Sequence, residues 1–165
     1  MTEEEKTRRN LQPQALEAEE AVLGSMLSSK EAVSISIQWL NSECFYKESH
    51  SKIFATMEAL FNRGDPVDTL SVVNQLKKNK EIESVGGPYF ISGLYESVPT
   101  VANVEHYAKI VLEKHILRNL IKVSHSMTKE AFDDTLDVDT ILDSAESAIF
   151  NISEKRLNGG FQKIK

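Results

Sequence analysis

The sequence predicts an all-α protein: a compact globular bundle of about five short helices, followed by a long projecting antiparallel helical hairpin. Apolar residues recur every three or four positions through most of the chain, which is the spacing of amphipathic helices. No run shows the strict alternation of a half-buried strand. The stretch from about residue 102 to 132 contains neither Gly nor Pro, and so predicts one helix of about 30 residues, or ~45 Å.

Two helices are expected after a polar N-terminal tail. Residues 1–12 are rich in charge and are expected to be disordered. After Pro13, an apolar stripe at helical spacing that includes Leu23 predicts the first helix. Ser28 followed by Glu31 is typical of a capping box, so a second helix is expected to begin there.

Three more short helices are delimited by residues that begin or end helices. Gly64 is expected to end the third helix at its C′ position, and Pro66 bars continuation. Asp68 is a good N-cap for the fourth helix. Pro88 opens the fifth helix at its first turn, and Gly93 inside it weakens that helix by up to ~1 kcal/mol relative to Ala.

The last two helices are expected to form the hairpin. An acidic turn lies between them, and either Asp137 or Asp139 can cap the second helix. In that helix apolar residues recur at alternating spacings of four and three, which is the period of a coiled-coil-like contact. This predicted seam consists of Val138, Leu142, Ala145, Ile149 and Ile152.

These patterns divide the chain into four parts. We expect a disordered tail at 1–12, a globular head at 13–101, the helical hairpin at 102–154 and the start of a linker at 155–165.

Composition and charge argue against several classes of protein. The net charge is −6, whereas proteins that hold DNA by its phosphates are normally basic. Cys44 is the single cysteine, so no internal disulfide can form. The first residues lack the apolar run of a secretory signal, and no stretch approaches the ~20 apolar residues of a membrane span. A cytoplasmic location is therefore expected.

No constellation of residues supports catalysis. No two of the four histidines lie three or four positions apart, so none forms a local metal pair on a helix. Cys44 has no evident base and is expected to act as a small buried hydrophobe. The acidic turn lacks the glycine and glutamate of a calcium-binding EF-hand loop, and no phosphate-binding loop motif occurs.

The hairpin is the most informative feature. Ile110, Leu117 and Ile121 lie near one line of the long helix. Val104, Val111 and Ile116 spread round to another. Packing of the two helices only on each other or on the head is one interpretation. We favour self-association, because a projecting hairpin would expose apolar surface. Each large aliphatic side chain gains roughly 1.5–3 kcal/mol on burial, so several in a twofold contact exceed an association cost of ~4–15 kcal/mol.

A series of short sequence blocks follows one another along almost the whole chain. They include Ala21-Val22-Leu23-Gly24, Arg63-Gly64-Asp65-Pro66-Val67-Asp68, Gly86-Gly87, Val98-Pro99-Thr100, Ala102-Asn103-Val104-Glu105, Glu113-Lys114, Leu117-Arg118, Leu142-Asp143 and Ala145-Glu146. From about Pro13 to Lys165, their order and spacing resemble the N-terminal domain of bacterial DnaB-type replicative DNA helicases.

This resemblance implies a non-catalytic function. It implies a non-catalytic collar domain of a hexameric helicase, in which hairpins pair between subunits to form a trimer of dimers. It also implies that the collar recruits a DnaG-type primase in DNA replication. No cofactor is implied for this segment, because ATP and Mg²⁺ would serve a motor domain beyond the linker. A helicase loader is a further candidate partner, and DNA would be contacted only weakly or indirectly.

Hairpin packing and self-association are assigned to Leu117, Leu120, Ile121, Ile141, Leu142, Ala145, Ile149 and Ile152. The surface that would face primase is assigned to the hairpin and its junction with the head, near Tyr89 and Phe90, together with Ile121. The alternative is a helical domain that guides single-stranded DNA. Such a domain would need a basic or aromatic track, and the negative charge argues against one.

Overall fold

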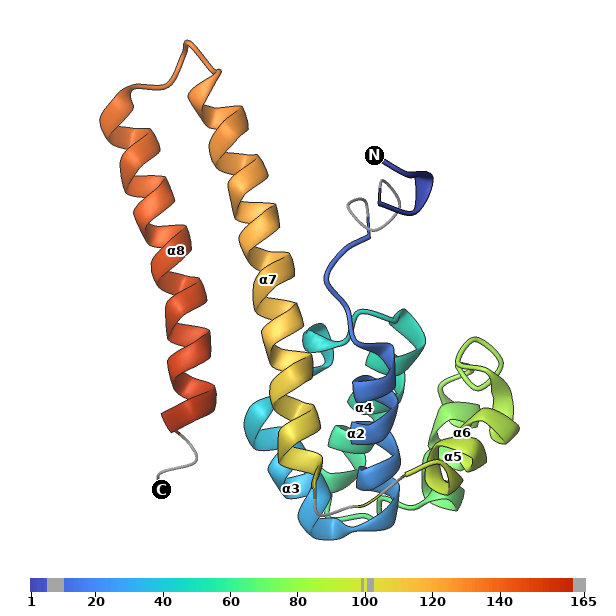
Figure 1. Cartoon of the computed structure of the whole chain (residues 1–165). Coiled ribbons are helices and arrows are strands. Elements are labelled where there is room, and N and C mark those ends of the chain that lie inside the picture. The colour runs from blue at the N-terminus through green and yellow to red at the C-terminus, as the bar shows by residue number, and fades with distance from the viewer. Residues whose placement is uncertain (6–10, 99, 101–102, 162–165) are drawn as a thin grey trace.

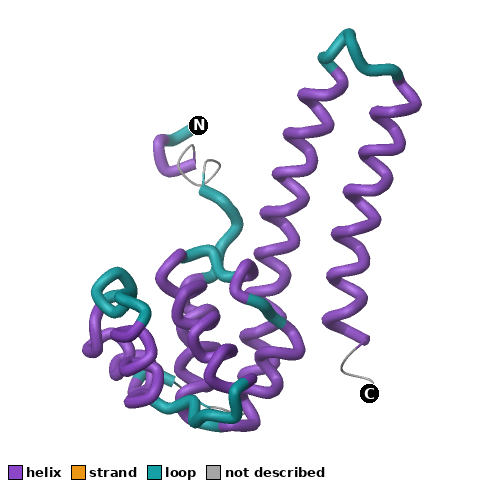
Figure 2. Tube along the Cα trace, turned by 180° about the vertical axis from the view of Figure 1, so that it is seen from behind, coloured by secondary structure: helices purple, strands orange, loops and turns teal. Residues whose placement is uncertain are grey.

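The computed structural model describes residues 1–5, 11–98, 100 and 103–161, and all regular elements within these ranges are helical (Figure 2). A single helical turn at residues 3–5 comes first. The elements that follow are α2 (Leu16–Ser28), α3 (Lys30–Trp39), the 3₁₀ turn η1 (Ser42–Cys44), α4 (Glu48–Asn62), α5 (Thr69–Lys78), α6 (Gly87–Glu96), α7 (Val104–Ala131) and α8 (Val138–Phe161). The five short helices α2 to α6 form the head, and α7 and α8 form the hairpin, as predicted (Figure 1). The predicted end of the hairpin at residue 154 is wrong, because α8 continues through Phe161 into the expected linker.

Helix α2 lies at the centre of the head. It packs against α3, α4, α6 and α7, and its Leu23 and Met26 are completely buried. Gly24 allows the close approach of α6, because a Cβ atom at this position would lie 2.3 Å from the carbonyl oxygen of Leu94 and 2.3 Å from Cγ2 of Val98. A residue with a side chain at position 24 would therefore force α2 and α6 apart.

Most of the predicted helix ends are confirmed. The carboxylate of Asp68 accepts a hydrogen bond from the backbone N–H of Ser71 at 2.8 Å. Gly64 has a φ of 78°, the left-handed conformation expected at a C′ glycine. Pro88 lies in the first turn of α6. Asp137 is the residue that caps α8, since its carboxylate accepts from the backbone N–H of Thr140 at 2.7 Å.

The predicted cap of the second helix is wrong by one residue. Ser29 is the N-cap of α3, and its hydroxyl accepts from the backbone N–H of Ala32. Ser28 instead ends α2, where its hydroxyl donates to the carbonyl of Gly24 at 2.9 Å. This local bond to the preceding turn keeps Ser28 inside the first helix.

Helix α7 belongs to the head at its start and leaves the head at its middle. Its buried residues end at His115, and none of residues 116–131, all of which the structure describes, is buried. The second half of α7 therefore projects from the head together with α8 (Figure 1). None of the helices in the described ranges is long and apolar enough to cross a bilayer.

Candidate interaction surface of the hairpin

The seam, where α7 packs against α8, covers one edge of a broad apolar stripe on α8. The half-buried residues of α8 in this seam are Ile141, Ala145, Ala148 and Ile152, at spacings of four, three and four. Residues from both helices line a hollow of about 330 Å³ in the seam, including Val123 and Met127 of α7. The coiled-coil-like period predicted for α8 is therefore present, but it passes through a different set of residues.

The structure divides the predicted seam between two faces of α8. Ala145 and Ile152 are half-buried, whereas Val138, Leu142 and Ile149 are 69%, 54% and 40% exposed. The reason is that the apolar stripe of α8 is wider than the contact with a single helix requires. Leu142 and Ile149 lie seven positions apart and so share one face of the helix.

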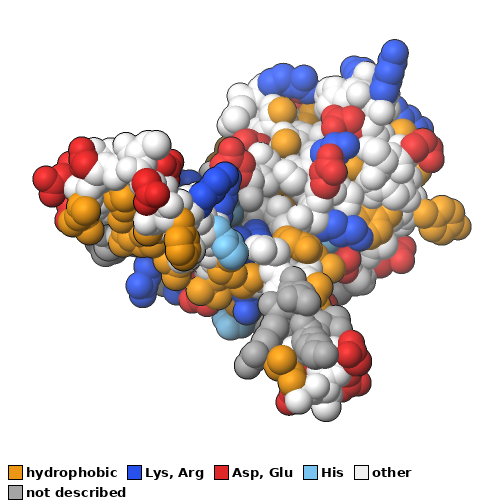
Figure 3. Space-filling model, turned by 90° about the horizontal axis from the view of Figure 1, so that it is seen from above, with side chains coloured by type: hydrophobic (Ala, Val, Ile, Leu, Met, Phe, Trp, Pro, Cys, Tyr) orange, Lys and Arg blue, Asp and Glu red, His pale blue; other side chains and the backbone are white. Residues whose placement is uncertain are grey.

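The remaining predicted hairpin residues lie on α7. Leu117 and Leu120 are 42% and 40% exposed, and Ile121 is half-buried. Seen from above, hydrophobic side chains gather in a band along one side of the projecting hairpin (Figure 3). We call Leu117, Leu120, Leu142 and Ile149 the outer apolar residues, because each is predicted to serve the hairpin and remains substantially exposed.

The predicted surface near Tyr89 and Phe90 does not join the hairpin within one chain. Both residues belong to α6, which packs on α2 and α5 and lies across α2 from the hairpin (Figure 1). Tyr89 is 94% exposed. The ring of Phe90 stacks on that of His50 with 6.1 Å between centroids, and the Lys47 ammonium lies 5.6 Å from its centroid. The expected position of α6 at the junction is thus wrong, because α2, α3 and η1 contact α7 there.

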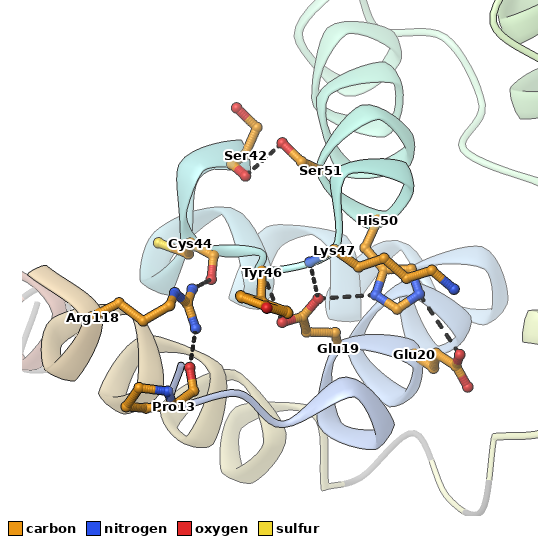
Figure 4. Close-up of polar contacts among 10 residues, drawn as sticks. All are labelled: Pro13, Glu19, Glu20, Ser42, Cys44, Tyr46, Lys47, His50, Ser51 and Arg118. Atoms are coloured by element: carbon orange, nitrogen blue, oxygen red, sulfur yellow. Dashed lines mark hydrogen bonds and ion pairs between the residues drawn. The ribbon is translucent and has the colours of Figure 1, made fainter. Parts of the chain in front are cut away.

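Arg118 is the polar centre of the true junction between head and hairpin. Its Nη1 donates to the carbonyl of Pro13 at 2.7 Å, and its Nη2 donates to the carbonyl of Cys44 at 2.8 Å (Figure 4). Its guanidinium also lies 5.4 Å from the ring centroid of Tyr46. Burial lowers the pKa of Arg118, and the nearby Glu19 carboxylate opposes this shift. Sequence reasoning missed this role because the two carbonyls are 105 and 74 residues away along the chain.

A second polar contact joins α2 to the start of α4. The buried carboxylate of Glu19 accepts from the backbone N–H groups of Tyr46 and Lys47, at 2.9 and 3.4 Å, and lies 2.9 Å from Nδ1 of His50 (Figure 4). Lys47 is the N-cap of α4 and supplies no capping side chain of its own. Glu19 therefore serves the N-terminus of a helix that is remote in sequence.

Cys44 and His115 are the other residues whose side chains could carry out chemistry, and both are buried. Cys44 is only 3% exposed, as expected for a small buried hydrophobe, and this burial raises the pKa of its thiol. Burial lowers the pKa of His115, and the positive charges of Arg118 and Lys155 add to the shift. In the described part of the chain, no three His, Cys, Asp or Glu side chains come together as metal ligands.

The sequence is similar to those of known replicative helicases. The profile of the family described as DnaB-like helicase N terminal domain matches residues 11–113. The chain is 39% identical over 153 residues to the replicative DNA helicase DnaB of Geobacillus stearothermophilus, covering 93% of this chain and 34% of that protein. It is 38% identical over 155 residues to the replicative DNA helicase DnaC of Bacillus subtilis (strain 168), covering 94% and 34%. The chain thus spans about a third of the length of these relatives.

Solved structures agree with the sequence matches. The fold is similar to the crystal structure of the N-terminal domain of DnaB helicase from Mycobacterium tuberculosis, with a TM-score of 0.80, 32% identity, and coverage of 86% of this chain and 99% of that one. It is also similar to a DnaB-like replicative helicase whose structure was described with its interactions with primase, with a TM-score of 0.67, 25% identity, and coverage of 82% and 31%. This chain therefore belongs to the DnaB-like helicase N-terminal domain family.

Proposed function

We propose that this chain is a non-catalytic assembly and docking module, the N-terminal collar of a hexameric replicative DNA helicase. In this role the hairpins of two chains pair, three pairs form the collar, and the collar recruits a DnaG-type primase. The observation that carries the proposal is the projecting hairpin, whose outer apolar residues are 40–54% exposed. Apolar surface of this kind marks an interface.

Two further observations support the proposal. The tip of the hairpin carries Asp133, Asp134 and Asp137 in the turn and Asp139 at the start of α8. This acidic end suits protein partners better than DNA phosphates. One similar solved structure concerns a helicase described with primase. Any contact with DNA is therefore proposed to be weak or indirect, and a single-stranded DNA guide is not favoured.

ATP hydrolysis is proposed to belong to another part of the assembly. ATP and Mg²⁺ would be needed only by a motor domain, so the chain itself would not hydrolyse ATP. A helicase loader is a further proposed partner. A role in replication also fits the cytoplasmic location expected from the sequence.

Self-association is tested by light scattering of the chain over a range of concentrations. The double variant Leu142→Asp with Ile149→Asp places two charges on the proposed pairing face and should reduce the average mass, because a desolvated charge opposes association. The control is Leu70→Asp, which makes the same kind of substitution once, on α5, at a side chain that is 70% exposed. A wild-type chain that stays monomeric, or a double variant that associates like the control, contradicts hairpin pairing.

Primase docking is tested separately by measuring the affinity for a primase C-terminal domain. Ile121→Asp should weaken this binding or the self-association, and Tyr89→Ala should weaken primase binding if α6 contributes to the docking surface. Unchanged sedimentation together with unchanged primase affinity in Ile121→Asp excludes that residue from the interface. An unchanged affinity in Tyr89→Ala removes α6 from the proposal.

A further inference from the structure

We infer that Arg118 is a positioning residue that fixes the angle between the head and the hairpin. The inference concerns the geometry of one chain. It deepens the proposed function and depends on that function only for its consequence in an assembly.

The position of Arg118 on α7 is the first reason. The last buried residue of α7 is His115, so Arg118 lies one turn further, where the helix leaves the head. The 14 residues from 118 to 131 then project over ~20 Å. Over this length a rotation of about 10° at the junction displaces the tip by ~3–4 Å.

The contacts of Arg118 are the second reason. One guanidinium ties α7 to two separate segments of the head, the segment that precedes α2 through Pro13 and the end of η1 through Cys44. The Cys44 segment is itself held in place, since the Cys44 N–H donates to the Asn41 carbonyl at 3.1 Å. Tyr46 lies against the guanidinium as well. Three neighbours around one planar group restrain both tilt and rotation of α7.

The chemistry of arginine is the third reason. The planar fork presents several donors in a fixed geometry, so two carbonyls in different directions are bound at once. The ammonium of lysine is a compact charge on a flexible stem, and it cannot reproduce both bonds together with the cation–π contact to Tyr46. The first half of α7 packs on α2, α3 and η1, and the second leg of the hairpin contacts the head through α3. The fork of Arg118 therefore adds a directional polar restraint at the point where α7 leaves the head.

In a paired assembly this restraint would set the distance between heads. If hairpins pair through the outer apolar residues, each head is held at the angle that Arg118 imposes. A chain with a loose junction could then still pair, but its heads would occupy a range of positions.

The angle is measured by pulsed electron spin resonance between two spin labels in one chain. Asn62→Cys on the head and Asp134→Cys at the hairpin tip supply exposed attachment points, in a Cys44→Ala background. The doubly labelled chain is diluted with unlabelled chain, so that only distances within one chain contribute. Arg118→Lys and Arg118→Met are compared with Lys122→Met, which removes a positive charge one turn further along α7 from an exposed side chain.

We expect a narrow distance distribution for the parent chain and for Lys122→Met. Both Arg118 variants should broaden the distribution or shift its mean by several ångströms, while circular dichroism shows unchanged helix content. A parent-like distribution in Arg118→Met overturns the inference. Should Arg118→Met fail to fold, Arg118→Lys decides in the same way. Because the labels report on one chain, the result stands whether or not hairpins pair, and a failure of the proposed function is recognised separately by light scattering.

Discussion

The carboxylate of Glu19 on α2 and the imidazole of His50 on α4 meet at 2.9 Å, with 1% and 0% of their side chains exposed (Figure 4). The same carboxylate accepts the backbone N–H groups at the start of α4. A single buried group thus connects the central helix of the head to a helix 31 residues further along. Tyr46, whose backbone N–H donates to Glu19, also contacts the guanidinium of Arg118 through its ring.

Removal of the Glu19 carboxylate should destabilise the head strongly. Glu19→Ala leaves buried donors without an acceptor, and the expected loss in the free energy of unfolding is at least about 3 kcal/mol. Urea unfolding followed by circular dichroism measures this loss. The control is Glu20→Ala, whose carboxylate is 40% exposed and 3.6 Å from Nε2 of His50, and which should cost within about 1 kcal/mol. Equal effects of the two substitutions would contradict a special role for Glu19.

Two glycine substitutions should have opposite effects. Gly24→Ala introduces a Cβ against the Leu94 backbone and should lower the free energy of unfolding by about 1–3 kcal/mol. Gly93→Ala introduces a Cβ that meets no described atom within 4 Å apart from its chain neighbours and the backbone of its own helix. It should therefore raise that free energy by up to about 1 kcal/mol. Thermal and urea unfolding of the two variants measure both changes in the free energy of unfolding. A neutral or stabilising Gly24→Ala would show that α2 and α6 are not closely packed.

Acidification should destabilise the junction through His115. Burial lowers the pKa of His115 in the folded chain below its usual value of 6.5, so the unfolded chain binds the proton more readily. The contribution of neutral His115 to the free energy of unfolding is complete above about pH 6.5. It decreases as the pH falls from there toward the lowered pKa. The contact of Asn119 Nδ2 with His115 Nε2 at 3.2 Å fits a neutral ring that accepts the hydrogen bond.

The measurement is the free energy of unfolding between pH 7.5 and 5.0 for the parent chain and for His115→Gln. Since glutamine does not titrate, the decrease below pH 6.5 should be smaller in the variant. Identical pH dependence in the two proteins would mean that His115 does not contribute to it.

The thiol of Cys44 should react slowly. It is buried, and burial raises its pKa, so both access and the thiolate fraction are reduced. At pH 8 we expect labelling by a disulfide reagent to be at least tenfold slower than labelling of an exposed thiol introduced by Asp134→Cys in a Cys44→Ala background. Urea should remove the difference. Equally fast reaction of the two thiols in the folded chain would show that the junction opens readily.

The sequence predicted the helices and most of their ends, because these depend on residues within a few positions of one another. Asp68, Gly64 and Pro88 act on their own turns and lie where the pattern placed them. The one misplaced cap arose where two serines adjoin, and a hydrogen bond back to Gly24 decided between them. The projecting hairpin was also predictable, since 28 helical residues exceed what a small head can cover.

The composition of the contact surfaces was decided only by the tertiary structure. Sequence periodicity placed Leu142 and Ala145 in one seam, but the position of α7 left the first exposed and half-buried the second. Periodicity gives the width of an apolar stripe, whereas its neighbours determine which edge is covered. Arg118 has no local partner that would mark it, because its two carbonyl acceptors lie in segments 105 and 74 residues away and come together only when the head folds.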